Sequence, residues 1–382
     1  MSPSSTRAKA GLVVPGLGHL LSGQVIEGVG LIALTVVLVY AGIHGFAQLD
    51  VLLARPGTPT FRIHPYVALT GWFLIAILTW YRGFRFAVPT PPASGHSRAT
   101  QAQAIWRQFR KSRSGMIGLY MVLVIVAIAI LTPFIAPFDP DALEVGSKLA
   151  PPTLDHWMGT DEFRRDMFSR VLYGARVSLS IGFVAVTLAA TIGTVFGSVA
   201  GYFGGWTDRI MMWCTDLILS LPRLILLLAI VGFFRAEGAQ SLFLIITVLG
   251  LTGWMGVARI VRSQVLSLKE QDFIQATKAL GLPTHRVLFV HLIPNAFAPV
   301  IVFASLAIGN TILTEAALSF LGLGVPPPTS TWGSIVNDGR EYLRSAWWIT
   351  MFPGLMIVFS VMSFNMLGDG LRDALDPKLR GR

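Results

Sequence analysis

The sequence is poor in cysteine and in charged residues. Its 382 residues include a single cysteine, Cys214, which excludes an intrachain disulfide and any cysteine-based zinc or Cys-X-X-Cys redox site. Charged residues make up 13% of the chain and hydrophobic residues 53%, whereas soluble domains carry about 25% charged residues. A mean hydropathy of +0.64 is too apolar for a soluble two-domain protein, so the composition predicts an integral membrane protein.

Acidic residues are also scarce, with 20 Asp and Glu against 30 Lys and Arg, which gives a formal net charge of +10. Such a charge fits a nucleic-acid-binding surface. Helical membrane proteins, however, collect Lys and Arg in their cytoplasmic loops and become basic for that reason alone. The hydrophobic composition favours this second explanation, and we expect membrane lipid but no nucleic acid among the partners.

Long apolar runs recur along the chain. A helix crosses the hydrocarbon core of a membrane with about 20 mostly apolar residues. Seven runs of suitable length contain no Asp, Glu, Lys or Arg, and one further run contains Asp216 and Arg223. The eight predicted transmembrane helices are Gly28–Leu49, Ile63–Tyr81, Gly115–Phe138, Val177–Thr207, Ile210–Phe234, Gly238–Ala258, Leu292–Thr314 and Ser345–Gly368. The predicted fold class is therefore all-α and membrane-embedded.

Basic residues are distributed unevenly among the connecting segments. Residues 82–113 contain seven Lys and Arg and no acidic residue, which places this segment in the cytoplasm by the positive-inside rule. With eight alternating spans, both termini are then cytoplasmic. The predicted cytoplasmic segments together hold 19 of the 30 Lys and Arg, which agrees with this orientation.

Composition divides the chain into four parts. Residues 1–81 form a predicted N-terminal transmembrane hairpin. Residues 82–114 form a cytoplasmic linker, because the stretch 88–97 is rich in proline and small polar residues. Residues 115–368 form a six-helix core, and residues 369–382 form a cytoplasmic tail.

The longest polar segment between two predicted core spans is 259–291. Four of its residues recur at i, i+3, i+4 and i+7, the spacing of one helix face: Phe273, Ala276, Thr277 and Leu280. Gly281 ends this short helix. An amphipathic helix too short to be stable alone needs a surface to lie on, and either a partner protein or the lipid headgroups can supply it.

The same helix carries a spacing pattern. Gln275-Ala276-Thr277 is followed after three residues by Gly281, and Pro294 lies 13 positions further on. This pattern resembles the EAA loop of ATP-binding-cassette (ABC) importer permeases, in which Glu-Ala-Ala stands at its head. The resemblance implies a coupling helix seated in a groove of a cytosolic ATPase. The residues that it implies in coupling are Glu270, Phe273, Gln275, Ala276, Thr277, Leu280, Gly281 and Pro294. The amide of Gln275 keeps the shape of the usual Glu but removes one ion pair.

Further segments narrow the resemblance to the dipeptide, oligopeptide and nickel importers, and most closely to their C-type permease subunit. These segments keep their order over about residues 105–382. They are Phe134–Pro140, Trp157–Glu162, Leu172–Leu179, Leu292–Asn295, Thr314–Gly324 and Gly368–Pro377. One departure is Arg164, which precedes Arg165-Asp166 where a glycine is usual. The extra hairpin 1–81 lies outside the resemblance.

The resemblance implies a six-helix ABC importer permease core in a multi-pass protein of the bacterial cytoplasmic (inner) membrane. The implied partners are a second permease subunit that forms a heterodimer, two cytosolic ABC ATPases and an extracytoplasmic solute-binding protein. The sequence lacks the Gly-x4-Gly-Lys-[Ser/Thr] phosphate-binding motif, so ATP hydrolysis is expected in separate subunits and the chain itself is not expected to be an enzyme. No catalytic constellation or cofactor motif is found, and the seven histidines lack the spacing of metal ligands.

Three ionisable residues lie in or near predicted spans. Intramembrane charges are costly and often functional. Asp216 and Arg223 are seven residues apart, which is two turns along one helix face. The two can pair with each other, or Arg223 can pair with Glu315. The alternative is that one of the three lines the translocation path and contacts a zwitterionic peptide.

The loop before residue 177 carries an apolar stripe made of Met167, Phe168, Val171, Leu172 and Ala175. The stripe is expected to lie at the outer membrane surface, because apolar stripes beside a span usually meet lipid. The alternative is a docking surface for the solute-binding protein.

These observations predict a permease subunit that couples ATPase closure to alternating access for dipeptides, oligopeptides or related solutes. An importer of nickel or another small solute is an alternative on the same scaffold. An ion-gradient secondary transporter is another, although no second copy of the core is seen in the sequence. A membrane receptor or scaffold would bind partners without solute flux.

Overall fold

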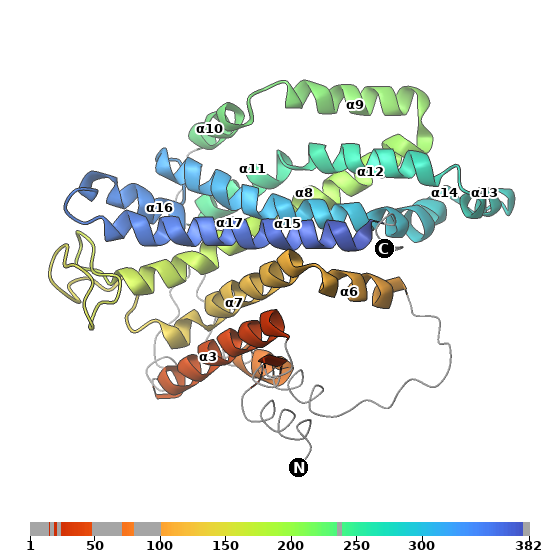
Figure 1. Ribbon diagram of the computed structural model, residues 1–382. Helices are drawn as coiled ribbons and strands as arrows, with labels where there is room; N and C mark the ends of the chain where they lie inside the picture. Colours follow the sequence, from red (N-terminus) through yellow and green to blue (C-terminus); the bar gives the residue numbers. More distant parts are fainter. Residues whose placement is uncertain are drawn as a thin grey trace, which may run out of the picture. The chain divides into compact units, whose positions relative to one another are not determined.

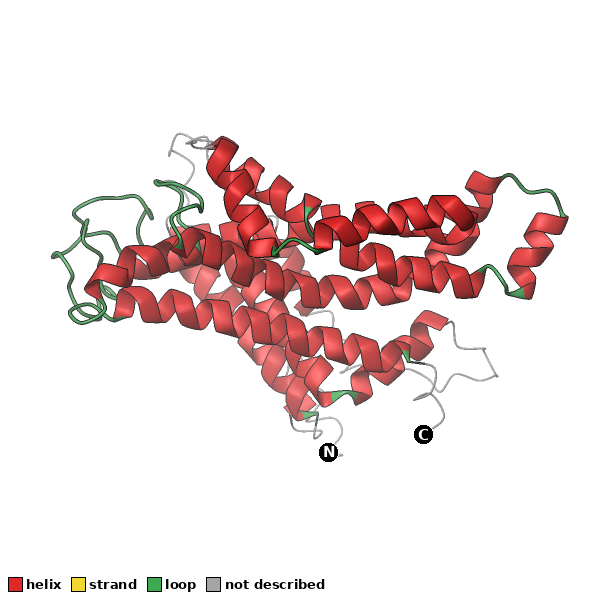
Figure 2. Cartoon of the chain, turned by 90° about the horizontal axis from the view of Figure 1, so that it is seen from above, coloured by secondary structure: helices red, strands yellow, loops and turns green. Residues whose placement is uncertain are grey.

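The computed structural model describes residues 15, 19–20, 24–47, 71–79, 101–234 and 239–376. These residues form helices and loops, with one isolated β-bridge between Thr160 and Asp166 (Figures 1 and 2). The N-terminal helices are α3 (Val25–Ala47), α6 (Gln101–Lys111) and α7 (Arg113–Ile135). The central ones are α8 (Met167–Phe203), α9 (Gly205–Leu219), α10 (Arg223–Phe234), α11 (Ala239–Leu251) and α12 (Trp254–Leu268). The last ones are α13 (Asp272–Ala279), α14 (Thr284–Arg286), the π-helical η1 (Val287–Leu292), α15 (Ile293–Phe320), α16 (Trp332–Asp338), the 3-10 helix η2 (Gly339–Tyr342) and α17 (Trp348–Leu375).

Six helical stretches in the described residues are long and apolar enough to cross a membrane. They are Val25–Ile43, Arg113–Ile135, Met167–Phe203, Gln240–Leu268, Thr284–Phe320 and Trp348–Leu375. The predicted all-α membrane fold is confirmed at this level. Of the predicted span Ile63–Tyr81, residues 71–79 are helical and the rest lies outside the described residues.

The predicted span Ile210–Phe234 is wrong as a single helix. It is divided into α9 and α10, which meet at an angle of 81°. Pro222 explains the break, because proline lacks an N–H and disfavours helical geometry in the residue before it. Asp216 and Arg223 therefore lie on different helices, and the two-turn spacing between them no longer places them on one face.

The chain divides into two compact units. Unit 1 comprises Met1–Leu179 and Pro327–Ala374, and unit 2 comprises Ser180–Pro326 and Leu375–Arg382. The boundaries fall inside α8 and near the end of α17. Each unit therefore contains part of the predicted core 115–368.

In unit 1, α3 packs along α7. The ring of Tyr120 in α7 occupies the space that a Cβ atom at Gly30 of α3 would take. The indole Nε1 of Trp72 donates a hydrogen bond to the carbonyl oxygen of Leu38 at 2.9 Å, which links the helical residues 71–79 to α3. Both α3 and the helical residues 71–79 therefore pack against α7 within unit 1.

Glycines bring α7 close to α17. Gly118 lies against the backbone of Leu367, and the Cα atom of Gly370 is 2.7 Å from the position of a Cβ atom at Gly115. Small residues at a crossing let two membrane helices approach and gain van der Waals contact. A larger side chain at either glycine of α7 would separate the two helices.

The polar loop of unit 1 is organised around Asp161, which is 2% exposed. Its carboxylate accepts hydrogen bonds from Arg165 Nε at 2.7 Å and from Arg170 Nη1 at 2.6 Å. The backbone N–H groups of Phe163 and Arg165 also donate to it, at 2.9 and 2.8 Å. Asp161 thereby joins the loop to the first turn of α8.

The C-terminal part of unit 1 contacts the same loop and the start of α8. Arg170 Nη2 pairs with Asp338 at 3.1 Å, and Trp332 is fully buried and donates its Nε1 hydrogen to the carbonyl of Val171 at 3.0 Å. The Tyr342 hydroxyl donates to Glu162 at 2.5 Å, and this hydrogen bond to a carboxylate raises the pKa of Tyr342 above its usual range.

The apolar stripe of this region is core rather than surface. Met167, Val171, Leu172 and Ala175 are between 0 and 6% exposed within unit 1. Phe168, the fifth residue of the stripe, is partly buried. The expectation that the stripe contacts lipid is therefore wrong for the four buried residues. The physical reason is that α8 begins at Met167, so that the stripe belongs to a long helix packed against α7 and α16.

Arg164 adopts a left-handed backbone conformation with φ of 61°. Its carbonyl accepts from the N–H of Val145, and its own N–H donates to the carbonyl of Asp161, both at 3.1 Å. Glycine reaches this conformation without a steric cost, whereas other L-residues do not. Arg164, which replaces the usual glycine, thus lies in a turn that favours glycine and that still forms with arginine.

In unit 2, a glycine stripe on α8 receives α12. Gly193, Gly197 and Gly201 are spaced by four residues and so lie on one helix face. A Cβ atom at Gly197 would collide with the carbonyl of Ala258, and one at Gly201 would lie 2.9 Å from the carbonyl of Arg262. This small-xxx-small pattern fixes α12 against α8.

Candidate functional site

The predicted coupling segment forms a short helix at the end of unit 2, beyond α12 and η1 (Figure 1). Helix α13 has eight residues, and an isolated helix of this length is unstable in water. Leu280 is its C-cap, and Gly281 follows with φ of 70°, where glycine is free to turn the chain. The predicted helix and its glycine stop are confirmed.

Two side chains of α13 are buried in unit 2, and one of them anchors the helix to other elements. Ile274 is 0% exposed and packs in a cluster with residues of α12, η1 and α15, among them Val265, Val287 and Val300. Thr277 is 9% exposed and donates its hydroxyl hydrogen to the carbonyl of Ile274 at 2.7 Å. Ile274 therefore links α13 to α12 and α15 through direct packing.

The exposed surface of α13 includes apolar side chains next to the buried face. Phe273 is 42% exposed and Leu280 is 80% exposed, and Ala276 lies between them in sequence and is also exposed. Thr277, which the sequence placed on the same face, points inward instead. The predicted common face of Phe273, Ala276, Thr277 and Leu280 is therefore corrected. The buried face is formed by Ile274 and Thr277, and Phe273 is exposed.

Gln275 and Lys278 fix the orientation of α13. The side-chain Nε2 of Gln275 donates to the carbonyl oxygen of Lys269 at 2.8 Å, closing the turn between α12 and α13. The ammonium of Lys278 lies 5.6 Å from the ring centroid of Tyr202 at the end of α8. A glutamate at 275 could accept but not donate a hydrogen bond when ionised, so the amide has a role of its own within the chain.

The remaining predicted coupling residues flank the helix. Glu270 is exposed just before α13, and Pro294 is exposed at the second position of α15. Proline removes one N–H from the helical ladder. The π-helical turn η1 lies immediately before α15. There the N–H of Ile293 donates to the carbonyl of Leu288, five residues earlier, so the backbone hydrogen bonds shift from the i−4 to the i−5 carbonyl.

Helix α9 is tied to α12 by two ion pairs. Arg262 pairs with Asp208, and Arg259 pairs with Asp216. Asp216 therefore pairs with Arg259 rather than with Arg223, and the predicted pair Asp216–Arg223 is wrong. The reason is that α9 and α10 diverge at Pro222, whereas α9 runs beside the basic face of α12.

Arg223 lines a cavity within unit 2 of about 250 Å3. The other polar lining side chains are those of Asn310 and Thr311 on α15. The remaining lining residues are Ala185, Val186, Ala189, Leu249, Gly253, Val257, Phe303, Leu306 and Ala307. A guanidinium and an amide in an otherwise apolar cavity can receive a carboxylate.

Glu315 lies apart from this cavity. It is 0% exposed and accepts a hydrogen bond from the Ser319 hydroxyl at 2.7 Å, one turn further along α15. The structure thus separates the three ionisable residues into an ion pair at Asp216, a cavity wall at Arg223 and a buried carboxylate at Glu315. Among the described residues, no group of three or more His, Cys, Asp or Glu is arranged to hold a metal ion.

Two features of the site were not predicted from the sequence. The glycine stripe at Gly193, Gly197 and Gly201 was visible as a repeated small-xxx-small spacing. Asn310 gave no comparable signal, because an amide inside an apolar run is informative only when its neighbours in space are known. The stripe positions α12, which connects the cavity to α13.

Comparison with known proteins identifies close relatives. The family model of the binding-protein-dependent transport system inner membrane component matches residues 193–381, and that of the N-terminal TM domain of oligopeptide transport permease C matches residues 100–152. Both matched ranges begin after α3 and residues 71–79. Helix α6, which falls within the predicted linker 82–114, is included in the second range.

Individual relatives cover most of the chain. The dipeptide transport system permease protein DppC of Alkalihalophilus pseudofirmus is 40% identical over 290 residues, covering 76% of this chain and 94% of its own. The oligopeptide transport system permease protein OppC of Bacillus subtilis is 41% identical, covering 72% and 91%. The glutathione transport system permease protein GsiD of Escherichia coli is 38% identical, covering 72% and 90%.

Proposed function

The chain belongs to the binding-protein-dependent transport permeases and is a membrane-spanning subunit of an ABC importer, and from this we propose that it carries dipeptides or oligopeptides. The C-type dipeptide and oligopeptide permeases among its relatives support this substrate class. The glutathione permease among them points to the chemistry that such solutes share, a small peptide with a free carboxylate. Nickel or another small solute is the alternative on the same scaffold.

The proposed topology has eight transmembrane helices with both termini in the cytoplasm of a bacterium. The hairpin 1–81 precedes the cytoplasmic segment 82–114, the six-helix core 115–368 and the tail 369–382. The basic segment 82–113 supports this orientation through the positive-inside rule. The membrane is then the cytoplasmic (inner) membrane.

The proposed assembly pairs this chain with a second permease subunit, two cytosolic ATPases and an extracytoplasmic solute-binding protein. The single observation that carries the coupling role is the exposed apolar side of α13. Phe273, Ala276 and Leu280 leave apolar surface open on a helix that is held by Ile274. An amphipathic helix presented in this way fits a hydrophobic groove of a partner protein. The flanking Glu270 lies at the rim of such a contact.

The mechanism follows from how α13 is attached. When ATP draws the two ATPases together, a seated α13 moves, and Ile274 transmits the movement to α12 and α15. These two helices also supply Val257 and Asn310 to the cavity wall. A nearly complete switch between two conformations requires a bias of about 5.5 kcal/mol. The closed ATPase pair supplies this bias through its different fit to the two states.

Within the path, we assign the peptide carboxylate to Arg223 with Asn310 as its second contact. A guanidinium binds a carboxylate by paired hydrogen bonds, and the apolar lining excludes competing water. This assignment predicts that Arg223→Gln lowers peptide uptake more than it lowers the amount of ATPase subunit that co-purifies with the chain. Asp216 and Glu315 are structural in this scheme.

The coupling role is tested by replacing both exposed side chains of α13, as Phe273→Ala with Leu280→Ala. The double variant is expected to purify with the second permease but to lose the ATPases, and peptide uptake should fall at least tenfold. The matched control replaces two exposed leucines of the unit 1 loop, Leu143 and Leu154, which are 64% and 93% exposed. Uptake that continues without ATPases would instead establish an ion-gradient transporter.

A further inference from the structure

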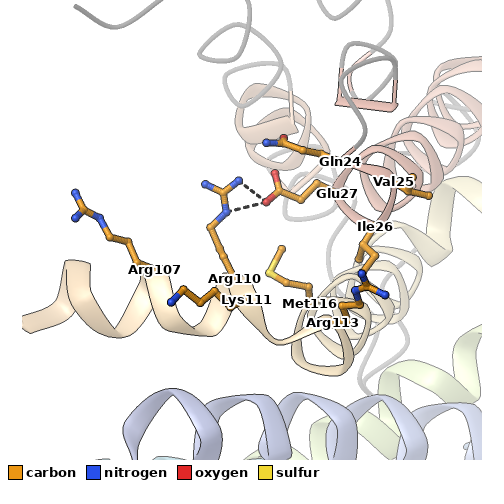
Figure 3. A pocket seen from close by; sticks show the side chains of 9 residues that line it. All are labelled: Gln24, Val25, Ile26, Glu27, Arg107, Arg110, Lys111, Arg113 and Met116. Atoms are coloured by element: carbon orange, nitrogen blue, oxygen red, sulfur yellow. Dashed lines mark hydrogen bonds and ion pairs between the residues drawn. The ribbon is translucent and has the colours of Figure 1, made fainter. Parts of the chain in front are cut away.

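A pocket with a basic lining lies within unit 1, where α3 and α7 begin and α6 ends (Figure 3). Its volume is about 620 Å3. The lining residues are Gln24, Val25, Ile26, Glu27, Arg107, Arg110, Lys111, Arg113 and Met116. The pocket therefore joins the N-terminal hairpin to the segment that precedes α7.

Most of the positive charge comes from α6. Arg107, Arg110 and Lys111 are spaced so that they share one helix face, and Arg113 adds a fourth cation from the first turn of α7. Glu27 is the single acidic residue of the lining, and Arg110 pairs with it at 2.6 Å, as Figure 3 shows. Within the described part of the chain, the other three cations form no ion pair, so the pocket has an excess of positive charge.

Helix N-termini add to this positive potential. Both α3 and α7 start at the pocket, and the unpaired N–H groups of a helix start carry about half a positive charge. Ser112 caps α7 by accepting a hydrogen bond from the N–H of Gly115 at 3.2 Å. The charged side chains and the two helix starts thus favour the same kind of ligand, an anion.

Across from α6, the lining includes three apolar side chains beside Gln24, Glu27 and Arg113. Val25, Ile26 and Met116 belong to the first turns of α3 and α7, both of which are membrane spans. Helix α6 carries its basic residues and Trp106, which stacks on Phe109, just before α7. A pocket that combines an excess of cations with apolar side chains matches a lipid headgroup, since a free phosphate ion gains nothing from the apolar side chains.

We propose that this pocket binds the phosphate of an anionic phospholipid headgroup. Arg107, Lys111 and Arg113 would hold the phosphate, and the apolar side chains would contact the glycerol and the upper acyl chain. The start of α3 would then complete a lipid site that α6 alone leaves open. The site is independent of the transported solute.

The test is native mass spectrometry of the full chain, purified with whatever subunits accompany it. The probes are phosphatidylglycerol, phosphatidylcholine and inorganic phosphate. The variant Arg107→Gln with Lys111→Gln removes two cations of the pocket, and each basic residue near a membrane surface strengthens binding to anionic lipid by about fivefold. The matched control is Lys148→Gln with Arg344→Gln, two exposed cations in loops of unit 1.

We expect the unmodified chain and the control to retain phosphatidylglycerol in preference to phosphatidylcholine, and the pocket variant to lose about tenfold or more of this preference. Equal retention by the pocket variant and the control would overturn the proposal. Binding of inorganic phosphate in place of phosphatidylglycerol would also overturn it, because the ligand would then be a soluble anion.

A second variant changes the result in the opposite direction. Glu27→Gln removes the acidic residue from the lining and releases Arg110 for the ligand. It is expected to retain phosphatidylglycerol several-fold more strongly than the unmodified chain. A gain of this kind cannot result from misfolding, and unchanged or weaker retention would count against the lipid site.

Discussion

The polar loop of unit 1 and helix α13 of unit 2 differ in how their side chains are used. In unit 1, the carboxylate of Asp161 is buried and fully used by two arginines and two backbone N–H groups. In unit 2, α13 is held by Ile274 and Thr277 and leaves Phe273 and Leu280 in solvent. The loop of unit 1 satisfies the hydrogen-bonding groups of its buried carboxylate internally, whereas α13 keeps apolar surface exposed.

The difference has a physical cause. A buried ion network with good hydrogen-bond geometry is expensive to open, because each charge would be left uncompensated. An eight-residue helix with one buried apolar anchor has little stability of its own and gains more from a partner. The loop of unit 1 therefore suits a fixed structural role, and α13 suits a moving contact with another subunit.

The largest expected effect comes from opening the unit 1 network. Asp161→Ala leaves the guanidinium of Arg170, which is 3% exposed, without its shortest partner. Breaking a buried pair in this way costs about 3–5 kcal/mol. We expect a clear drop in the thermal unfolding midpoint of the purified chain in detergent. Glu144→Gln, which removes an exposed pair with Arg164, should change stability by less than about 1 kcal/mol.

A smaller effect should come from the support of α13 in unit 2. Gly197→Ala forces a methyl group against the carbonyl of Ala258 and separates α8 from α12. Such overpacking costs about 1–3 kcal/mol. We expect lower thermal stability together with weaker ATPase recovery. The control is Gly354→Ala in α17, where the added methyl group meets no atom of the chain, and equal losses in both variants would refute the role of the glycine stripe.

The smallest effect should be a gain in stability. Arg164→Gly relieves the left-handed backbone at φ of 61°, at the cost of a more flexible unfolded chain. The relief of strain exceeds the entropic cost, so the free energy of unfolding should rise by roughly 0.5–1 kcal/mol. Thermal unfolding in detergent measures it, with Arg344→Gly in another exposed turn as a control that should destabilise slightly. A loss of stability in Arg164→Gly would mean that its side chain, not its backbone, matters in the turn.

The amino-acid sequence determined those features that depend on composition and on local spacing. Uncharged runs predicted the membrane helices because burial in hydrocarbon leaves no other choice for the backbone. Gly281 and the periodicity before it predicted α13, and the EAA-like spacing predicted its role. The side chains that face inward were less predictable, since Phe273 and Ile274 are adjacent apolar residues and only packing distinguishes them.

Tertiary structure decided what depends on residues far apart in the chain. Asp216 pairs with Arg259 rather than with Arg223, because the break at Pro222 turns α10 away from α9. Arg223 shares a cavity with Asn310, 87 positions later, and Glu27 meets Arg110 across 83 positions. Charges and amides act through whatever lies within a few ångströms of them, and that distance is set by the packing of helices rather than by spacing along the sequence.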